Sequence, residues 1–210
     1  AAGVHGELAE RTDSGRPAHS KGFLDKSRAT ASENVAELHP RVADGWDVVL
    51  VEPSDAVMVQ HDYRDLLSGE RVEAVAESTY DVMEYLDTHR LVEDLDTRDT
   101  TETLTYHGHC HQKSVKKDHH AVGALRRAGY EVDPLDSGCC GMAGSFGYEA
   151  EHVSMSDAIG DVLFEQVEES NGDRVVAPGA SCRTQLGDRD EDAERPPTPI
   201  EMLATAVRSA

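Results

Sequence analysis

Two cysteines stand side by side in a glycine-rich stretch, DSGCCGMAGSFG, at residues 136–147. They are Cys139 and Cys140, and the chain holds two others, Cys110 and Cys182. Four thiolates can ligate an iron–sulfur cluster or a tetrahedral zinc ion. The surrounding glycines let the backbone approach an inorganic cofactor and present amide groups to its sulfurs. Because neighbouring residues chelate a single ion awkwardly, the adjacent pair favours a multinuclear cluster.

Histidines and carboxylates provide further candidate ligands. His107, His109 and His111 surround Cys110. We consider His109 and His111 as additional metal ligands, with hydrogen bonding to a sulfur or a solvent-facing role as alternatives. Glu52 and Asp55 follow the apolar run WDVVLV, and we expect them to be loop carboxylates rather than ligands.

The segments that must position these residues alternate between strands and helices. Apolar periodicity and turn residues predict strands at 46–51, 103–107, 130–135 and 174–177, and helices at 24–40, 72–86, 115–128, 156–169 and 200–210. This alternation predicts an α/β fold with a mostly parallel sheet. Cys110, the Cys139–Cys140 pair and Cys182 each follow the C-terminal end of a predicted strand. Such ends share one edge of a parallel sheet, so we expect the four thiols to converge.

The chain also contains an internal repeat. Residues 45–55 align without a gap with residues 172–182, and residues 1–18 align with residues 127–141. We therefore predict two pseudo-symmetric, Rossmann-like parallel-sheet halves that arose by duplication.

The two predicted domains are residues 1–100 and residues 101–210. Arg16 and Pro17 align with the cysteine pair, and Asp55 aligns with Cys182, so we expect a metal site only in the second domain. The second domain begins with a strand and a helix that have no counterpart before Ala1. We therefore expect the first half to be incomplete at its N-terminus.

The charge balance excludes several function classes. The chain has 41 Asp and Glu residues against 20 Lys and Arg, a net charge of −21. Such a surface repels nucleic acids and anionic lipids. The dispersed acidic excess is typical of halophilic proteins from salt-saturated cytoplasm, as in haloarchaea. The sequence has no run of about 18 apolar residues that would span a membrane, and no secretion signal. We therefore expect a cytoplasmic protein, in which cysteines serve metal binding or redox chemistry rather than disulfides.

Three motifs resemble the second copy of the cysteine-rich CCG repeat: HGHCHQKS, SGCCGMAGSFG and PGASCRTQ, at residues 107–114, 137–147 and 178–185. That repeat occurs in heterodisulfide reductase subunits and in iron–sulfur subunits of glycolate oxidase and anaerobic glycerol-3-phosphate dehydrogenase. It also occurs at the C-terminus of FAD-linked D-lactate dehydrogenases, which the first-half motifs GRPAHSKGFLDKSR and VVLVEPSD resemble most. In its fuller form the last motif is Cys-x-x-Cys. Here Gly179 replaces the first of those cysteines, which leaves the cluster type open.

The resemblance implies an iron–sulfur electron-transfer module, a component or fragment of an oxidoreductase. Its dehydrogenase would use flavin to oxidise a 2-hydroxy acid such as D-lactate or glycolate, or glycerol 3-phosphate, and pass electrons to a downstream acceptor. FAD is expected on a partner domain or subunit, and a membrane quinone would be reached through a partner. We expect a [4Fe–4S] cluster, or zinc as the alternative, at Cys110, Cys139, Cys140 and Cys182. The rival functions are a structural zinc module that docks a catalytic domain and a thiol redox protein that uses the Cys139–Cys140 pair.

Overall fold

The computed structural model describes residues 3–9, 13–98, 100–188 and 194–208. The chain divides into two compact units, residues 3–85 and 86–210, and each is described by itself. Each unit contains one small parallel sheet, which confirms the α/β fold. The expected domains, 1–100 and 101–210, rest on the duplication and stay a prediction.

The second unit is built on a three-stranded parallel sheet. β3 (Thr103–Tyr106) lies between β4 (Glu131–Pro134) and β5 (Arg174–Val176), so all three expected strands are confirmed. Leu104 and Thr105 of the central strand are fully buried, as expected for a strand that is covered on both faces.

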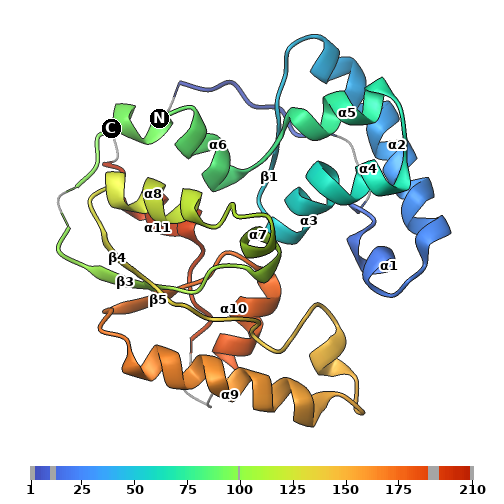
Figure 1. The fold of residues 1–210 in the computed structure, drawn as a ribbon. Coiled ribbons are helices and arrows are strands. Elements are labelled where there is room, and N and C mark those ends of the chain that lie inside the picture. Colours follow the sequence, from blue (N-terminus) through green and yellow to red (C-terminus); the bar gives the residue numbers. More distant parts are fainter. Residues whose placement is uncertain (1–2, 10–12, 99, 189–193, 209–210) are drawn as a thin grey trace. The chain divides into compact units, whose positions relative to one another are not determined.

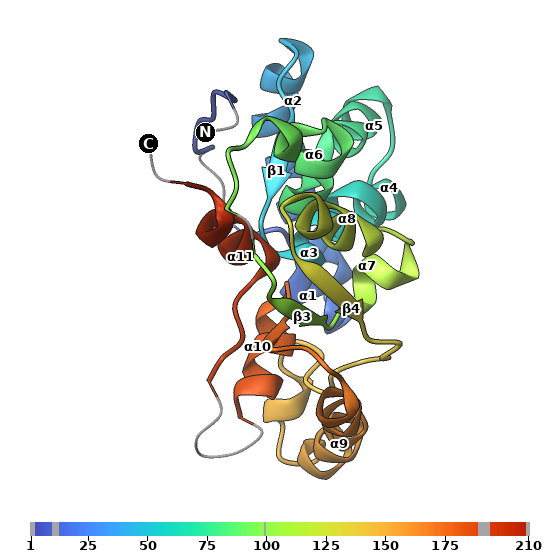
Figure 2. The same cartoon turned by 90° about the vertical axis from the view of Figure 1, so that its left-hand side faces the viewer.

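Helices cover both faces of this sheet. α8 and α11 lie on one side, and α9 and α10 lie on the other (Figure 1, Figure 2). The helical segments of the unit are η2 (Leu91–Asp94), α7 (Cys110–Ser114), α8 (His119–Arg127), η3 (Phe146–Tyr148), α9 (Val153–Glu169), α10 (Ala180–Gly187) and α11 (Pro199–Ala206). Because the three strands are parallel, their C-terminal ends lie at the same edge of the sheet.

The first unit has a two-stranded parallel sheet, in which β1 (Val48–Leu50) pairs with β2 (Thr79–Asp81). Its core packs α2 against α5 through Ala31, Val35, Val72 and Val75. The helical segments of the unit are α1 (Arg16–Ser20), α2 (Leu24–Ala43), α3 (Pro53–Val57), η1 (Met58–Asp62), α4 (Tyr63–Leu66), α5 (Glu70–Glu77) and α6 (Val82–Thr88), of which α6 extends into the second unit.

Several helices differ from the sequence prediction. The helix expected over 115–128 begins only at His119, because Lys116 has a left-handed backbone conformation with φ +59°. The single helix expected over 72–86 is wrong, because β2 divides that segment into α5 and α6. Thr79 ends α5 by donating its hydroxyl to the Val75 carbonyl at 2.6 Å, and the Asp81 carboxylate accepts the Met83 N–H at 2.9 Å to start α6. α2 continues past Pro40 to Ala43. Within the described residues, no helix combines the length and apolar character needed to cross a membrane.

Candidate metal centre

The four cysteines lie where the sequence predicted them, beyond the C-terminal ends of the three strands. Cys110 opens α7 after β3, Cys139 and Cys140 lie in the loop after β4, and Cys182 lies in the first turn of α10 after β5. Because the strands are parallel and adjacent, these ends share one edge of the sheet.

The four side chains form a continuous set of contacts. Cys110 is hydrogen-bonded to Cys139, Cys139 to Cys140, and Cys140 to Cys182. Among the described residues, no group of three or more His, Cys, Asp or Glu side chains has the spacing of a ready-made site for a metal ion. The contacts bring together thiols from three strand ends, and whether they bind a metal stays a prediction.

The hydrogen bonds divide the thiols into donors and acceptors. Cys110 and Cys140 act as donors and are partly desolvated, and both effects raise the pKa of each. The pKa of Cys139 is lowered, chiefly by the bonds that it accepts from Cys110 and Cys140 and further by the Gly141 N–H at 3.4 Å. The pKa of Cys182 is lowered because it accepts a bond from Cys140. Two of the four sulfurs are therefore stabilised as thiolates, the form in which cysteine binds metals.

The glycine after the cysteine pair is required by two features of the backbone. Gly141 has φ +94°, a conformation that side chains rarely adopt. A Cβ there would also meet the carbonyl of Ser156 in α9 and approach the Gly160 N–H at 3.2 Å. This close approach of loop and helix buries Cys140 against the same apolar cluster as Cys182 and Leu163.

Three polar residues that the sequence did not identify as a group fix the surrounding loops. His107 is fully buried, and its Nδ1 lies 2.7 Å from the Ser137 hydroxyl. Its Nε2 is buried without an oxygen or nitrogen partner among the described residues, while the ring interacts with the sulfur of Cys182. Lys113 Nζ donates to the Ser137 carbonyl at 2.5 Å, and burial lowers its pKa. Spacing alone gives no signal for Ser137, because its partners come from another strand end.

The His109 side chain fills the space that a cysteine side chain at position 179 would need. The side chain is buried, and a Cβ at Gly179 would lie 2.8 Å from its Nε2 and closer still to its Cδ2. His109 Nδ1 accepts the His111 N–H at 3.3 Å and so caps α7. The ring of His111 packs edge-on against His109, with centroids 5.2 Å apart. Histidine at 109 and glycine at 179 are thus a sterically matched pair.

In the first unit, the positions that align with the cysteines of the second unit carry other side chains. Asp55 is the third residue of α3 as Cys182 is the third residue of α10, and it accepts a 2.5 Å hydrogen bond from Ser14. Arg16 donates to the Ser54 carbonyl at 3.2 Å and pairs with Asp62. These contacts bring the loop around residue 14 to the helix after β1, much as Cys140 reaches Cys182 in the second unit.

The remaining candidates of the first unit have structural roles. Pro17 lies in the first turn of α1 and offers no ligand atom. Glu52 is the N-cap of α3 and accepts the Ser54 N–H at 3.4 Å and the Ser54 hydroxyl at 3.0 Å.

The donor set of the second unit fits a thiolate-ligated centre. The four sulfurs are linked in series from Cys110 to Cys182, and the buried His107 imidazole and the half-buried Lys113 ammonium lie near them. Sulfur ligands of this kind suit iron–sulfur clusters and zinc.

Comparison with known proteins supports the resemblance seen in the motifs. Residues 104–187 match the model of the CCG family, a cysteine-rich domain. The chain is 30% identical over 208 residues to one subunit of the anaerobic glycerol-3-phosphate dehydrogenase of Escherichia coli K12, a match that covers 95% of this chain and 50% of that protein. It is 28% identical over 179 residues to the D-2-hydroxyglutarate dehydrogenase of the same organism, and 29% identical over 183 residues to that of Haemophilus influenzae, in each case over 82% of this chain and 17% of the relative. The chain therefore spans at most about half the length of these relatives.

Proposed function

We propose that this chain, whose residues 104–187 are a cysteine-rich CCG domain, is the iron–sulfur electron-transfer module of a flavin-linked dehydrogenase. The contact of Cys110, Cys139, Cys140 and Cys182 at one sheet edge carries the proposal. The names of the relatives give two substrate classes, glycerol 3-phosphate and a 2-hydroxy acid. The flavin would reside on a partner domain or subunit, which would deliver electrons to this unit.

The four cysteines would hold a [4Fe–4S] cluster, which supplies one-electron transfer when bound. Gly141 and Gly179 keep side chains out of the loops that surround the sulfurs. His109 would serve as a hydrogen-bond donor rather than a ligand, because its Nδ1 accepts the His111 N–H and the ring proton therefore resides on Nε2. Donors near cluster sulfurs raise the reduction potential by stabilising negative charge.

The first experiment is anaerobic purification followed by iron, sulfide and zinc analysis and an optical spectrum. The proposal requires iron and acid-labile sulfide, and a broad visible absorbance that bleaches on reduction. A colourless protein with stoichiometric zinc would instead support a structural docking module. A metal-free protein that forms a Cys139–Cys140 disulfide would support a thiol redox protein.

Substitutions in the two units provide a matched comparison. Cys140→Ser and Cys182→Ser should abolish iron uptake, because each removes one of the two buried sulfur ligands. Asp55→Ala changes the aligned position in the first unit and should leave the iron content unchanged. Iron loss in Asp55→Ala with folding intact, or iron retention in both serine variants, would contradict a single site at the cysteines.

The cellular setting follows from the same proposal and from the charge. We place the protein in salt-rich cytoplasm, as in haloarchaea, because its net charge is −21. Its electron acceptor would be a membrane quinone reached through a partner protein.

A further inference from the structure

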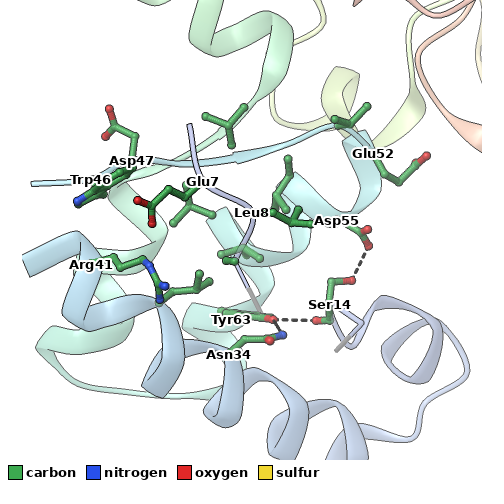
Figure 3. Close-up of a pocket in the computed structure, with 17 residues that line it drawn as sticks. Glu7, Leu8, Ser14, Asn34, Arg41, Trp46, Asp47, Glu52, Asp55 and Tyr63 are labelled. Atoms are coloured by element: carbon green, nitrogen blue, oxygen red, sulfur yellow. Dashed lines mark hydrogen bonds between the residues drawn. The ribbon is translucent and has the colours of Figure 1, made fainter. Parts of the chain in front are cut away.

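A groove of about 370 Å³ runs along β1 in the first unit. Figure 3 shows Trp46 and Asp47 at one end of this groove and Glu52 and Asp55 at the other. Each residue from 46 to 52 borders it, a length of roughly 20 Å at about 3.3 Å per residue. The groove therefore follows the whole strand rather than one end of the sheet.

The groove lies along an edge of β1 that has no partner strand among the described residues. β2 pairs with the other edge, where the Val48 N–H donates to the Ser78 carbonyl at 2.8 Å. Because successive residues of a strand direct their backbone groups to opposite edges, the N–H groups of Val49 and Val51 face the groove. Within the described part of the chain, no backbone hydrogen bond joins β1 to residues 3–9.

Apolar side chains around the groove are exposed to solvent. Leu8, which also borders the groove, is 99% exposed, Val51 is 60% exposed and Val49 is 41% exposed. In a parallel sheet such residues are normally covered on both sides. The unpaired edge of β1 and these exposed apolar side chains are features that a further apolar strand beside β1 would cover.

The second unit shows which strand occupies the corresponding place. In the repeat alignment β1 corresponds to β5, and the segment before Ser14 corresponds to β4. β3 lies between β4 and β5, and the Val176 carbonyl accepts the His107 N–H that follows β3 at 3.0 Å. Val49 aligns with Val176, and both direct their backbone groups to this same edge. The groove thus lies beside β1 where β3 lies beside β5 in the second unit.

We propose that this groove binds a parallel, apolar β-strand that corresponds to β3 of the second unit. A segment of the polypeptide outside residues 1–210 would supply this strand. The relative from Escherichia coli that matches 95% of this chain has about half of its length outside the match, so such a polypeptide has room for the strand. The strand would pair with Val49 and Val51, cover Leu8 and Trp46, and complete a three-stranded sheet. The proposal concerns the first unit and does not depend on the metal.

A graft tests this proposal with the chain's own second copy. Residues 101–126, with Cys110→Ser, would be fused directly before Ala1, because Arg127 aligns with Ala1. We expect amide exchange at Val49 and Val51 to slow by at least about tenfold, as buried ladder hydrogen bonds require. The emission of Trp46, the sole tryptophan of the chain, should shift to the blue. The matched control is the same graft with Thr105→Pro in the grafted copy, since proline interrupts a central strand.

If the amides of Val49 and Val51 exchange at the same rates in the graft as in its proline control, the proposal is overturned. Slow exchange in the ungrafted chain, together with a dimeric mass by light scattering, would also overturn it and identify a second copy as the occupant.

A second test needs no graft. Val49→Pro should leave the melting temperature of the present chain nearly unchanged, because the lost N–H faces the groove, whereas Leu50→Pro should unfold the unit because its N–H faces β2. Equal destabilisation by the two substitutions would show that the groove edge is already paired.

Discussion

The pairing of His109 with Gly179 accounts for the chain's departure from the Cys-x-x-Cys motif. The imidazole fills the volume that a side chain at 179 would need, and it is held there by burial and by the His111 N–H. Gly179 has φ −92°, so its backbone would accept any residue. The constraint at this position is therefore steric contact with one ring.

This contact predicts the stability of two alanine variants. Gly179→Ala should lower the free energy of unfolding by about 1–3 kcal/mol, the usual cost of overpacking a buried site. Gly138→Ala should have little effect, because a Cβ there meets nothing within 4 Å. Urea unfolding of both variants measures the difference.

A double-mutant cycle shows whether His109 is the cause. In a His109→Ala background the cost of Gly179→Ala should largely disappear, since the overlapping ring has been removed. Additive costs in the double variant would show that another neighbour causes the destabilisation.

At the scale of elements, sequence patterns predicted the strands that position the thiols but not the strand that divides 72–86. β3 alternates threonine with Leu104 and Tyr106 and β5 contains two adjacent valines, whereas β2 consists of Thr79, Tyr80 and Asp81 and carries no apolar pattern. The convergence of the cysteines followed from strand ends alone. The contacts of Ser137 with His107 and Lys113 join different strand ends, so sequence spacing could not predict them.

β2 ends in a buried carboxylate that starts α6. Asp81 accepts the Met83 N–H, and Glu84 reaches back to the Asp81 N–H at 3.2 Å, which makes a reciprocal cap. The pKa of Asp81 is raised to about 7, chiefly by burial and also by the nearby Glu84 and Glu52 carboxylates, while backbone hydrogen bonds from Met83 and Glu84 act to lower it. The fold therefore favours the protonated form of this group.

This shift predicts a loss of stability as the pH rises. Below about pH 4 the Asp81 carboxyl is protonated in both the folded and the unfolded chain. Between about pH 4 and 7 it is ionised in the unfolded chain but still protonated in the folded chain. The free energy of unfolding should thus fall by at most about 4 kcal/mol across this range and then level off.

Asp81→Asn keeps an acceptor oxygen, so its stability relative to the parent should increase from pH 5 to pH 8. Urea unfolding at both pH values tests this expectation. Asp25→Asn, at an exposed site, is the control, and an equal pH response in the two variants would rule out the buried carboxyl as the source.

At the scale of the whole molecule, the dominant feature is an excess of carboxylates with few bases to balance them. α9 illustrates it, because the helix has no basic residue and exposes five acids, Asp157, Asp161, Glu165, Glu168 and Glu169. The last two lie at the helix C-terminus, where negative charge opposes the helix dipole. Repulsion of this kind, repeated over a chain of net charge −21, destabilises the compact state in dilute buffer.

Salt should relieve this repulsion, because the Debye length falls from about 10 Å at 0.1 M to about 3 Å at 1 M ionic strength. We expect the melting temperature to rise by at least about 10 °C between dilute buffer and molar KCl, a gain of roughly 3 kcal/mol for a chain of this size. Changing the five exposed acids of α9 to their amides should reduce the salt dependence, since fewer charges then need screening. Calorimetry of the parent protein and of the amide variant at matched ionic strengths measures the salt dependence of the melting temperature. A flat melting profile, or one that the amide substitutions leave unchanged, would show that surface charge does not limit the stability of this fold.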